Sequence, residues 1–230
     1  MKLLRGIIAM LPLAVTAAVL PFMPESVPMH YDINGAVERM GSRYELLLLP
    51  LLIMVIVAVS VYSMKHYAER ADGTENDTEA KAAKANAKML NILSLAVPAV
   101  FGALQIGILY MTYRNAKAQS VEVNSELIAR LTFVLIGIMC VVFGFLMPNT
   151  ARNHIFGLRV TWSLYNDNTW RRSNRFGGIV FMIIGLLMIV TSSFVPATAL
   201  VFLVLGYLLV GTVVSVAYAY KSYKDEISAE

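Results

Sequence analysis

The chain has 230 residues, of which 58% are hydrophobic and only 15% are charged, and its mean hydropathy is +0.65. Soluble domains contain about 45–50% apolar and about 25% charged residues, so this composition excludes an ordinary cytosolic enzyme and a disordered protein. The single cysteine, Cys140, excludes a disulfide framework and a cysteine-rich metal site. A lipid bilayer is therefore the expected solvent for most of the chain.

Six apolar stretches are long enough to cross a membrane, which takes about 20 mostly apolar residues in a helix. The stretches are continuous rather than alternating, and backbone groups in lipid must be paired internally, so helices are favoured over barrel strands. The predicted fold is an all-α integral membrane protein with structured first and fourth loops. Its six transmembrane helices are expected at residues 6–23, 44–64, 89–113, 131–148, 176–191 and 197–220.

These spans divide the chain into four parts. The first is an N-terminal two-helix module, the second a cytoplasmic linker with a helix extension, the third helices three and four, and the fourth a loop motif with helices five and six. In that order the parts cover residues 1–64, 65–88, 89–148 and 149–230.

The orientation follows from the lysine and arginine residues that flank the spans. Both termini and the second and fourth loops together carry fourteen of them, whereas the first, third and fifth loops carry five. The positive-inside rule therefore predicts cytoplasmic termini and outward-facing odd loops. The first span can also be read as a signal peptide, because Lys2 and Arg5 precede its apolar core. No clear A-x-A cleavage site follows, and the apolar stretch continues to Met23, so a retained helix is favoured.

Loop one, residues 24–43, is expected to be compact. Asn34-Gly35 is a strong turn signal. Ser42 and Glu45 have the spacing of a capping box, which predicts a sharp start to the second helix. Three prolines at the start of this region prevent the first helix from continuing: Pro21, Pro24 and Pro28.

Three residues of loop one, His30, Asp32 and Glu38, can be read as metal ligands. No paired histidine or cysteine spacing accompanies them, so the metal signal is weak. The simpler interpretation is a hydrogen-bonded histidine in a folded loop. We therefore expect no metal and no cofactor.

Loop two, residues 65–88, ends in an Ala- and Lys-rich segment that favours helix. The third helix is expected to begin near Glu79, and from there to Tyr113 it would be about 52 Å long. The hydrocarbon core is only about 30 Å thick, so part of this helix should protrude. Lys81, Lys84 and Lys88 share one face of it, which fits either lipid headgroups or a docking face for a cytoplasmic partner.

Loop four, residues 149–175, holds both tryptophans of the chain, five arginines and one acid, Asp167. An interfacial belt explains the tryptophans and arginines. It explains the single acid less well, and we expect Asp167 to pair with Arg159 or Arg175 and to fix the shape of the loop. The loop is also compatible with a short amphipathic helix capped at Ser163.

The spans lack an obvious chemical site. Gln105, flanked by Gly102 and Gly107, is the main polar residue deep in an apolar run, and it can bridge helices. Charged residues are missing at mid-depth, which disfavours an ion-coupled transporter. The sequence also lacks the phosphate-binding, zinc-protease and hydrolase motifs that would indicate an enzyme.

Two sets of residues in loops one and four form a recognisable pattern. In loop one they are Pro24, Pro28, His30, Asn34, Gly35, Gly41, Ser42 and Arg43. In loop four they are Asn153, Gly157, Arg159, Trp162, Asp167, Trp170, Asn174 and Arg175. Together these loops resemble those of the SdpI family of bacterial membrane proteins, and their spacing agrees across six spans. The chain departs from the usual family pattern in three places: Arg43 replaces a lysine, Val160-Thr161 replaces Thr-Pro, and Asp167 replaces a glutamate.

This resemblance implies a multi-pass protein of the bacterial plasma membrane that protects against a membrane-active peptide toxin. It also implies possible capture of a cytoplasmic repressor protein, with no direct binding of nucleic acid. A small-molecule or ion permease is the alternative, with Gln105, Tyr110 and Tyr113 as its best available polar lining. A membrane enzyme is disfavoured, because no nucleophile–base pair is recognisable.

Overall fold

The computed structural model describes residues 2–32, 37–118, 125–153 and 155–229. Within them, six α-helices are long and apolar enough to cross a membrane, which confirms the predicted fold class. The helices are α1 (Lys2–Val19), α2 (Leu48–Asp72), α3 (Asp77–Ala118), α4 (Ser125–Leu146), α5 (Asp167–Thr191) and α6 (Ala197–Ile227). The shorter elements are the 3₁₀ turns η1 (Leu20–Phe22), η2 (Arg43–Leu47) and η3 (Met147–Asn149), and the strands β1 (Ser26–Tyr31) and β2 (Val37–Ser42).

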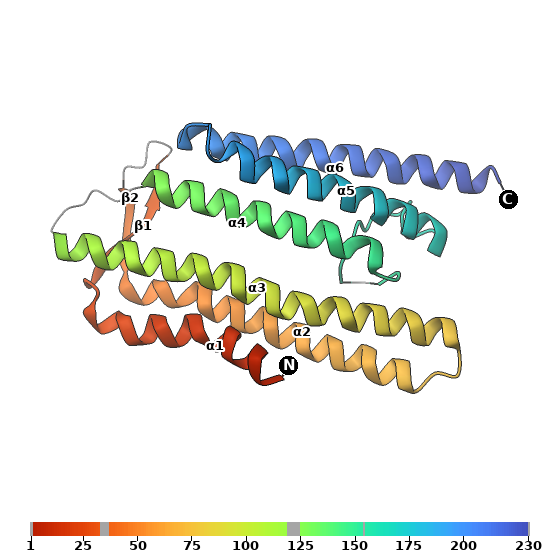
Figure 1. Cartoon of the computed structure of the whole chain (residues 1–230), viewed down its shortest axis with the longest axis horizontal. Helices are drawn as coiled ribbons and strands as arrows, with labels where there is room; N and C mark the ends of the chain where they lie inside the picture. Colours follow the sequence, from red (N-terminus) through yellow and green to blue (C-terminus); the bar gives the residue numbers. More distant parts are fainter. Residues whose placement is uncertain (1, 33–36, 119–124, 154, 230) are drawn as a thin grey trace.

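The helices form two groups of three that lie side by side, α1–α3 in one and α4–α6 in the other (Figure 1). The groups meet chiefly where α3 packs against α4. At that junction Met89, Leu90 and Leu93 of α3 form one buried cluster with Leu146 of α4. The β-hairpin lies at one end of the bundle, whereas loop four, the α2–α3 turn and the C-terminus lie at the other.

Glycines let α4 and α5 approach closely. A Cβ atom on Gly144 would lie 2.4 Å from the carbonyl oxygen of Gly178, and one on Gly178 would lie 2.5 Å from the carbonyl oxygen of Gly144. Gly137 and Gly185 form a second pair of the same kind two turns away. In lipid, where helices gain no hydrophobic drive to associate, such backbone contact supplies the packing energy.

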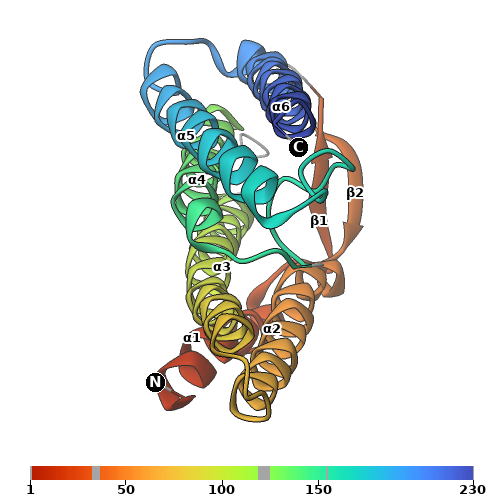
Figure 2. The ribbon, with the colours of Figure 1, turned by 90° about the vertical axis from the view of Figure 1, so that its right-hand side faces the viewer.

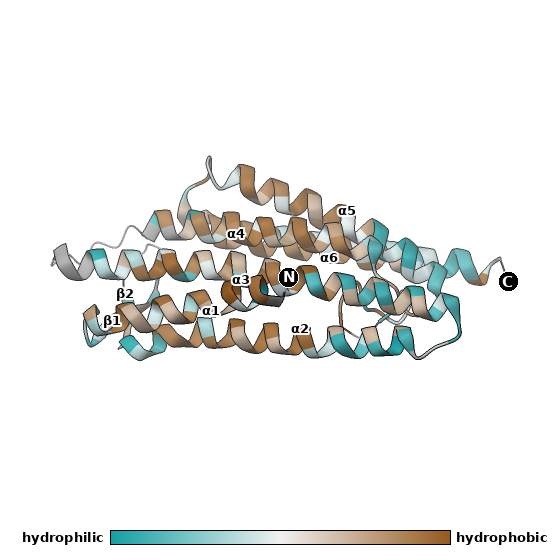
Figure 3. Ribbon diagram, turned by 60° about the horizontal axis from the view of Figure 1, so that its bottom comes forward, coloured by the Kyte–Doolittle hydropathy of each residue, from teal (hydrophilic) through white to brown (hydrophobic). Residues whose placement is uncertain are grey.

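The end of the bundle that carries loop four is polar. Asn76 caps α3, because its Oδ1 accepts hydrogen bonds from the backbone N–H groups of Thr78 at 3.0 Å and Glu79 at 3.3 Å. The helix start predicted near Glu79 is therefore confirmed. With 42 residues, α3 is about 63 Å long, twice the hydrocarbon thickness of about 30 Å. The hydrophilic ends of α2, α3 and α6 extend past the apolar zone (Figure 3).

The predicted orientation can be tested by thiol labelling. In a Cys140→Ser background, we expect Met40→Cys on the hairpin to react with a membrane-impermeant maleimide in intact cells. Glu75→Cys, in the turn between α2 and α3, should react only after the membrane is opened. Both positions are exposed, so accessibility within the protein does not limit either reaction. The reverse labelling pattern would overturn the orientation.

Candidate functional site at two structured loops

Loop one folds into an antiparallel hairpin, β1–β2, that is anchored to the bundle by one side chain. Val27 is completely buried in a cluster with four apolar residues of the neighbouring helices and turns, Leu20, Met23, Leu46 and Leu109. The expected compact loop is thus correct, although the two strands were not predicted. Burial of Val27 fixes the base of the hairpin over the ends of α1 and α3.

The second strand runs directly into the next helix through the predicted capping box. The Ser42 backbone N–H donates to Glu45 Oε1 at 3.0 Å, and the Ser42 hydroxyl caps the start of η2, the turn that precedes α2. Arg39 donates to Glu45 Oε2 at 2.8 Å. Gly41 has no room for a side chain, because a Cβ there would lie 2.3 Å from Glu45 Oε1. Arg43 donates to the carbonyl of Met23 at 3.0 Å and so ties the hairpin to the end of the first span.

The remaining matching residues of loop one lie on the outer part of the hairpin. Pro24 and His30 are exposed, and Pro28 lies opposite Met40 in the sheet. His30 Nε2 lies 3.3 Å from Glu38 Oε2, as expected for a histidine with a polar partner. The turn residues Asn34 and Gly35 lie outside the described residues.

We expect the purified protein to contain no stoichiometric zinc. In the described ranges, no group of three His, Cys, Asp or Glu side chains is arranged to hold a metal ion. Elemental analysis of the wild type and of His30→Ala should give the same substoichiometric value. One zinc per chain that disappears in His30→Ala would show that His30 is a metal ligand.

Loop four is a densely hydrogen-bonded structure rather than an open connection. Its first turn is organised by Asn153, whose Oδ1 accepts from the backbone N–H groups of Ile155 and Phe156, both at 2.8 Å. The Asn153 amide donates to the carbonyl of Ala151 at 2.8 Å and reaches Asn86 of α3 at 3.5 Å. This one buried side chain therefore shapes the loop and connects it to the other group of helices.

The centre of loop four is built around Gly157 and two buried side chains of α5. Trp170 is only 2% exposed, and its indole N–H donates to the carbonyl of Thr150 at 2.9 Å. Asn174 is fully buried and accepts from the backbone N–H of Leu158 at 2.8 Å. Gly157 has φ +116° and lies against both, since a Cβ would be 2.4 Å from Asn174 Oδ1. Only glycine adopts this backbone conformation at little cost.

The structure corrects the role expected for this tryptophan. Trp170 does not lie in an interfacial belt, because it is enclosed by the loop and hydrogen-bonded within it. Trp162 is partly buried and makes an edge contact with Tyr220 of α6 at a ring-centre distance of 4.9 Å.

The expected ion-pair partners of Asp167 are also wrong. Asp167 Oδ1 lies 3.2 Å from Nε of Arg152, and not beside Arg159 or Arg175. Arg152 additionally donates to the carbonyls of Leu164 and Tyr165, so it closes the loop on itself. Arg159 and Arg175 are exposed and form no ion pair with any residue that the structure describes.

The predicted helix capped at Ser163 is absent from this described segment. Ser163 is fully buried, and its hydroxyl donates to the carbonyls of Leu158 and Val160 and so stabilises a turn instead. The helix begins at Asp167, where Asn166 Oδ1 accepts from the backbone N–H of Thr169 at 2.8 Å. The fifth span therefore starts earlier in the chain than the apolar stretch alone indicated.

Polar residues inside the spans serve packing. Gln105 is 2% exposed and donates to Thr16 Oγ1 at 3.0 Å and to the carbonyl of Leu46 at 2.9 Å, which confirms that it bridges helices. Arg5, which the sequence indicated only as an orienting charge, is 6% exposed and donates to the side-chain oxygen of Asn91. Its inward position was not predicted, because a basic residue at a helix end normally extends toward the headgroups.

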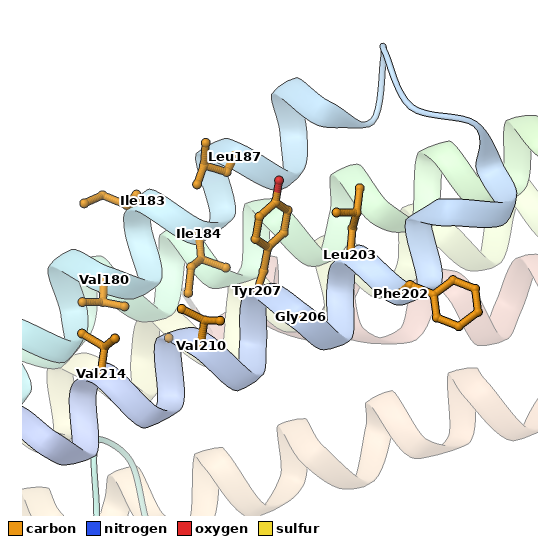
Figure 4. A pocket seen from close by; sticks show the side chains of 11 residues that line it. Val180, Ile183, Ile184, Leu187, Phe202, Leu203, Gly206, Tyr207, Val210 and Val214 are labelled. Carbon is orange, nitrogen blue, oxygen red and sulfur yellow. The ribbon is translucent and has the colours of Figure 1, made fainter.

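A groove between α5 and α6 has a volume of about 560 Å³ (Figure 4). Ile183 and Leu187 line it from α5, and Phe202, Tyr207 and Val210 line it from α6. Its walls are almost wholly apolar, as expected for a surface in contact with acyl chains. Gln105, Tyr110 and Tyr113, the polar lining suggested for a permease, do not line this groove: Gln105 is enclosed by helix contacts and Tyr110 is exposed on the helix surface.

Two family models match segments of the chain that contain these two structured loops. Residues 149–219, which cover loop four, α5 and most of α6, match the SdpI/YfhL protein family. Residues 7–54, which include the hairpin, match a domain of unknown function, DUF1648. The Immunity protein SdpI of Bacillus subtilis (strain 168) is 24% identical over 203 residues, which are 88% of this chain and 86% of that protein. The resemblance to the SdpI family is confirmed. No solved structure gives a significant match.

The chain is thus a multi-pass membrane protein, and the two loops inside its matched regions, the hairpin and loop four, lie at opposite ends of the bundle (Figure 1). The match to SdpI extends over far more of the chain than either of these two regions alone.

Proposed function

We propose that this chain is a membrane immunity protein that protects its cell against a membrane-active peptide toxin. The likeness to an immunity protein over 88% of the chain carries this proposal. The proposed orientation directs the hairpin outward, where it would meet the toxin first. In this proposal loop four, at the cytoplasmic end, captures a repressor protein when toxin is present. Coupling the two ends requires two states of the helices with different affinities for each partner.

The distribution of polar side chains supports a binding function over catalysis or transport. Gln105 and Arg5 make contacts between helices, whereas exposed polar groups gather at the two ends of the bundle, on the hairpin at one end and on loop four and the α2–α3 turn at the other. A protein that recognises a peptide outside and a protein inside needs its specific groups in those two places.

The proposal is tested by expressing the chain in a toxin-sensitive bacterial strain and measuring growth against toxin concentration. The wild type should restore growth that the empty vector does not. His30→Ala, on the exposed hairpin, should lower the tolerated toxin concentration at unchanged membrane abundance. Glu75→Ala, an exposed change at the opposite end, is the matched control and should behave as wild type. Failure of the wild type to protect at normal abundance would contradict the proposal.

A further inference from the structure

The C-terminal end of α6 lies along loop four, and its residues 220–227 fall outside the family match to residues 149–219 (Figure 2). Three aromatic pairs hold this end of α6, one of them to Phe176 of α5 and the other two to loop four. Phe176 stacks on Tyr218 with ring centres 4.0 Å apart. The other two pairs, Trp162–Tyr220 at 4.9 Å and Tyr165–Tyr223 at 5.1 Å, meet edge to face.

Two acids of α6 extend this contact to the start of α5. Glu226 accepts hydrogen bonds from the side-chain amides of Asn166 at 2.9 Å and Asn168 at 2.6 Å, one on each carboxylate oxygen. Asp225 pairs with Arg172 at 3.1 Å. Asn166 is also the cap of α5, so one residue ends the loop, starts the helix and holds the tail of α6.

The polar interactions between α6 and loop four are ones that water or a binding partner can replace at little cost in free energy. The side chains of Arg172 and Asp225 are 38% and 45% exposed, and exposed ion pairs contribute little net free energy because water solvates both partners after separation. The contact also buries a polar atom without compensation. The hydroxyl of Ser222 is buried and has no hydrogen-bond partner among the described residues, so separation would return it to water.

We propose that residues 220–227 of α6 form a displaceable strap over loop four, and that a cytoplasmic protein segment with carboxylate and aromatic side chains binds the surface that the strap covers. This inference rests on the proposed role of loop four in capturing a cytoplasmic protein. The surface supplies two aromatic rings, two amide donors and Arg172, and the exposed, unpaired Arg159 and Arg175 belong to the same loop. Such a surface complements carboxylate and aromatic side chains, which Asp225, Glu226 and the two tyrosines of the strap supply, although Lys221 and Lys224 leave the strap without net charge.

The strap explains how binding of the cytoplasmic partner can be switched on and off. While the strap is in place, a partner binds only in proportion to the small fraction of molecules whose surface is uncovered. Movement of α6 within the membrane, where its other face borders lipid and the groove beside α5, would change that fraction. The strap thus supplies the two-state element that coupling between the two ends requires.

The test measures binding of a synthetic peptide with the sequence of residues 218–229 to the purified full-length protein in detergent. The variant Asp225→Asn/Glu226→Gln weakens the strap and should bind the peptide about tenfold more tightly than wild type, since more molecules are uncovered. Asp72→Asn/Glu75→Gln, at the exposed end of α2 and the turn that follows it, removes the same two charges and should leave affinity unchanged. A peptide of the same composition in scrambled order should bind neither protein.

A second experiment fixes the strap to loop four by a cross-link and compares one variant with itself, so a folding defect of that variant would affect both measurements equally. In a Cys140→Ser background, Asn168→Cys and Glu226→Cys are joined with a short thiol cross-linker, and peptide binding is compared before and after joining. Binding should be lost on joining. Equal binding by the locked and unlocked forms, or by the double variant and the wild type, would overturn the strap. Toxin protection is measured separately by growth. Loss of protection would contradict the immunity proposal, whereas unchanged peptide binding would contradict the strap, so the two failures can be told apart.

Discussion

Replacing Trp170 with alanine is expected to unfold loop four and to lower stability by about 3–5 kcal/mol, the usual cost of removing a buried aromatic side chain. The indole fills the centre of the loop, contacts Gly157 and satisfies the carbonyl of Thr150. We expect a clear fall in thermal midpoint in detergent and rapid proteolysis of residues 150–166 in inside-out vesicles.

Trp162→Ala is the matched control for this experiment. The Trp162 side chain is only partly buried and contacts Tyr220 at its edge, so its loss should lower the midpoint far less. Equal midpoints for the two variants would mean that both tryptophans are interchangeable membrane anchors, as the sequence-based interpretation held.

The second large effect is expected for Gly178→Leu. The added side chain would meet the carbonyl oxygen of Gly144 at 2.5 Å and Pro148 at 3.0 Å, so α4 and α5 would have to separate. Overpacking usually lowers stability by about 1–3 kcal/mol. The Gly144 carbonyl belongs to the backbone and cannot rotate away as a side chain can, so we expect a loss of stability at or above the upper end of this range. We expect little folded protein by size-exclusion chromatography in mild detergent.

Gly206→Leu is the control for Gly178→Leu. It adds the same side chain to another glycine within a span, but nothing lies within 4 Å of its Cβ position in the groove between α5 and α6. Its elution profile should match that of the wild type. A normal profile for Gly178→Leu would show that the close approach of α4 and α5 is not needed for folding.

The parts of this fold that depend on local rules were predictable from the sequence. A bilayer requires long apolar helices, so hydropathy located all six, and the capping box at Ser42 and Glu45 marked the start of η2, the 3₁₀ turn that leads into α2. The start of α3 followed from helix propensity in the same way. The two strands of loop one were missed, although a turn pair such as Asn34-Gly35 between short runs is a recognised hairpin signal.

Loop four could not be predicted in detail, because its structure depends on contacts between distant residues. Arg152, Arg159 and Arg175 all carry the charge that Asp167 needs, and only the folded path of the chain brings Arg152 to it. A tryptophan at a membrane surface and one enclosed by a loop look alike in sequence, so Trp170 was misinterpreted. The acids of α6 meet loop four across more than fifty residues, a pairing that no local pattern indicates.

The central claim is that the exposed surface of loop four acts in immunity or its signalling and does not merely anchor the protein. The most direct measurement is membrane abundance together with toxin resistance and repressor capture for Arg159→Ala and Arg175→Ala, with Arg70→Ala at the exposed end of α2 as the charge-matched control. Both arginines are exposed and unpaired among the described residues, so we predict normal abundance and reduced resistance or capture. Normal abundance with full resistance and full capture in both variants would contradict the account.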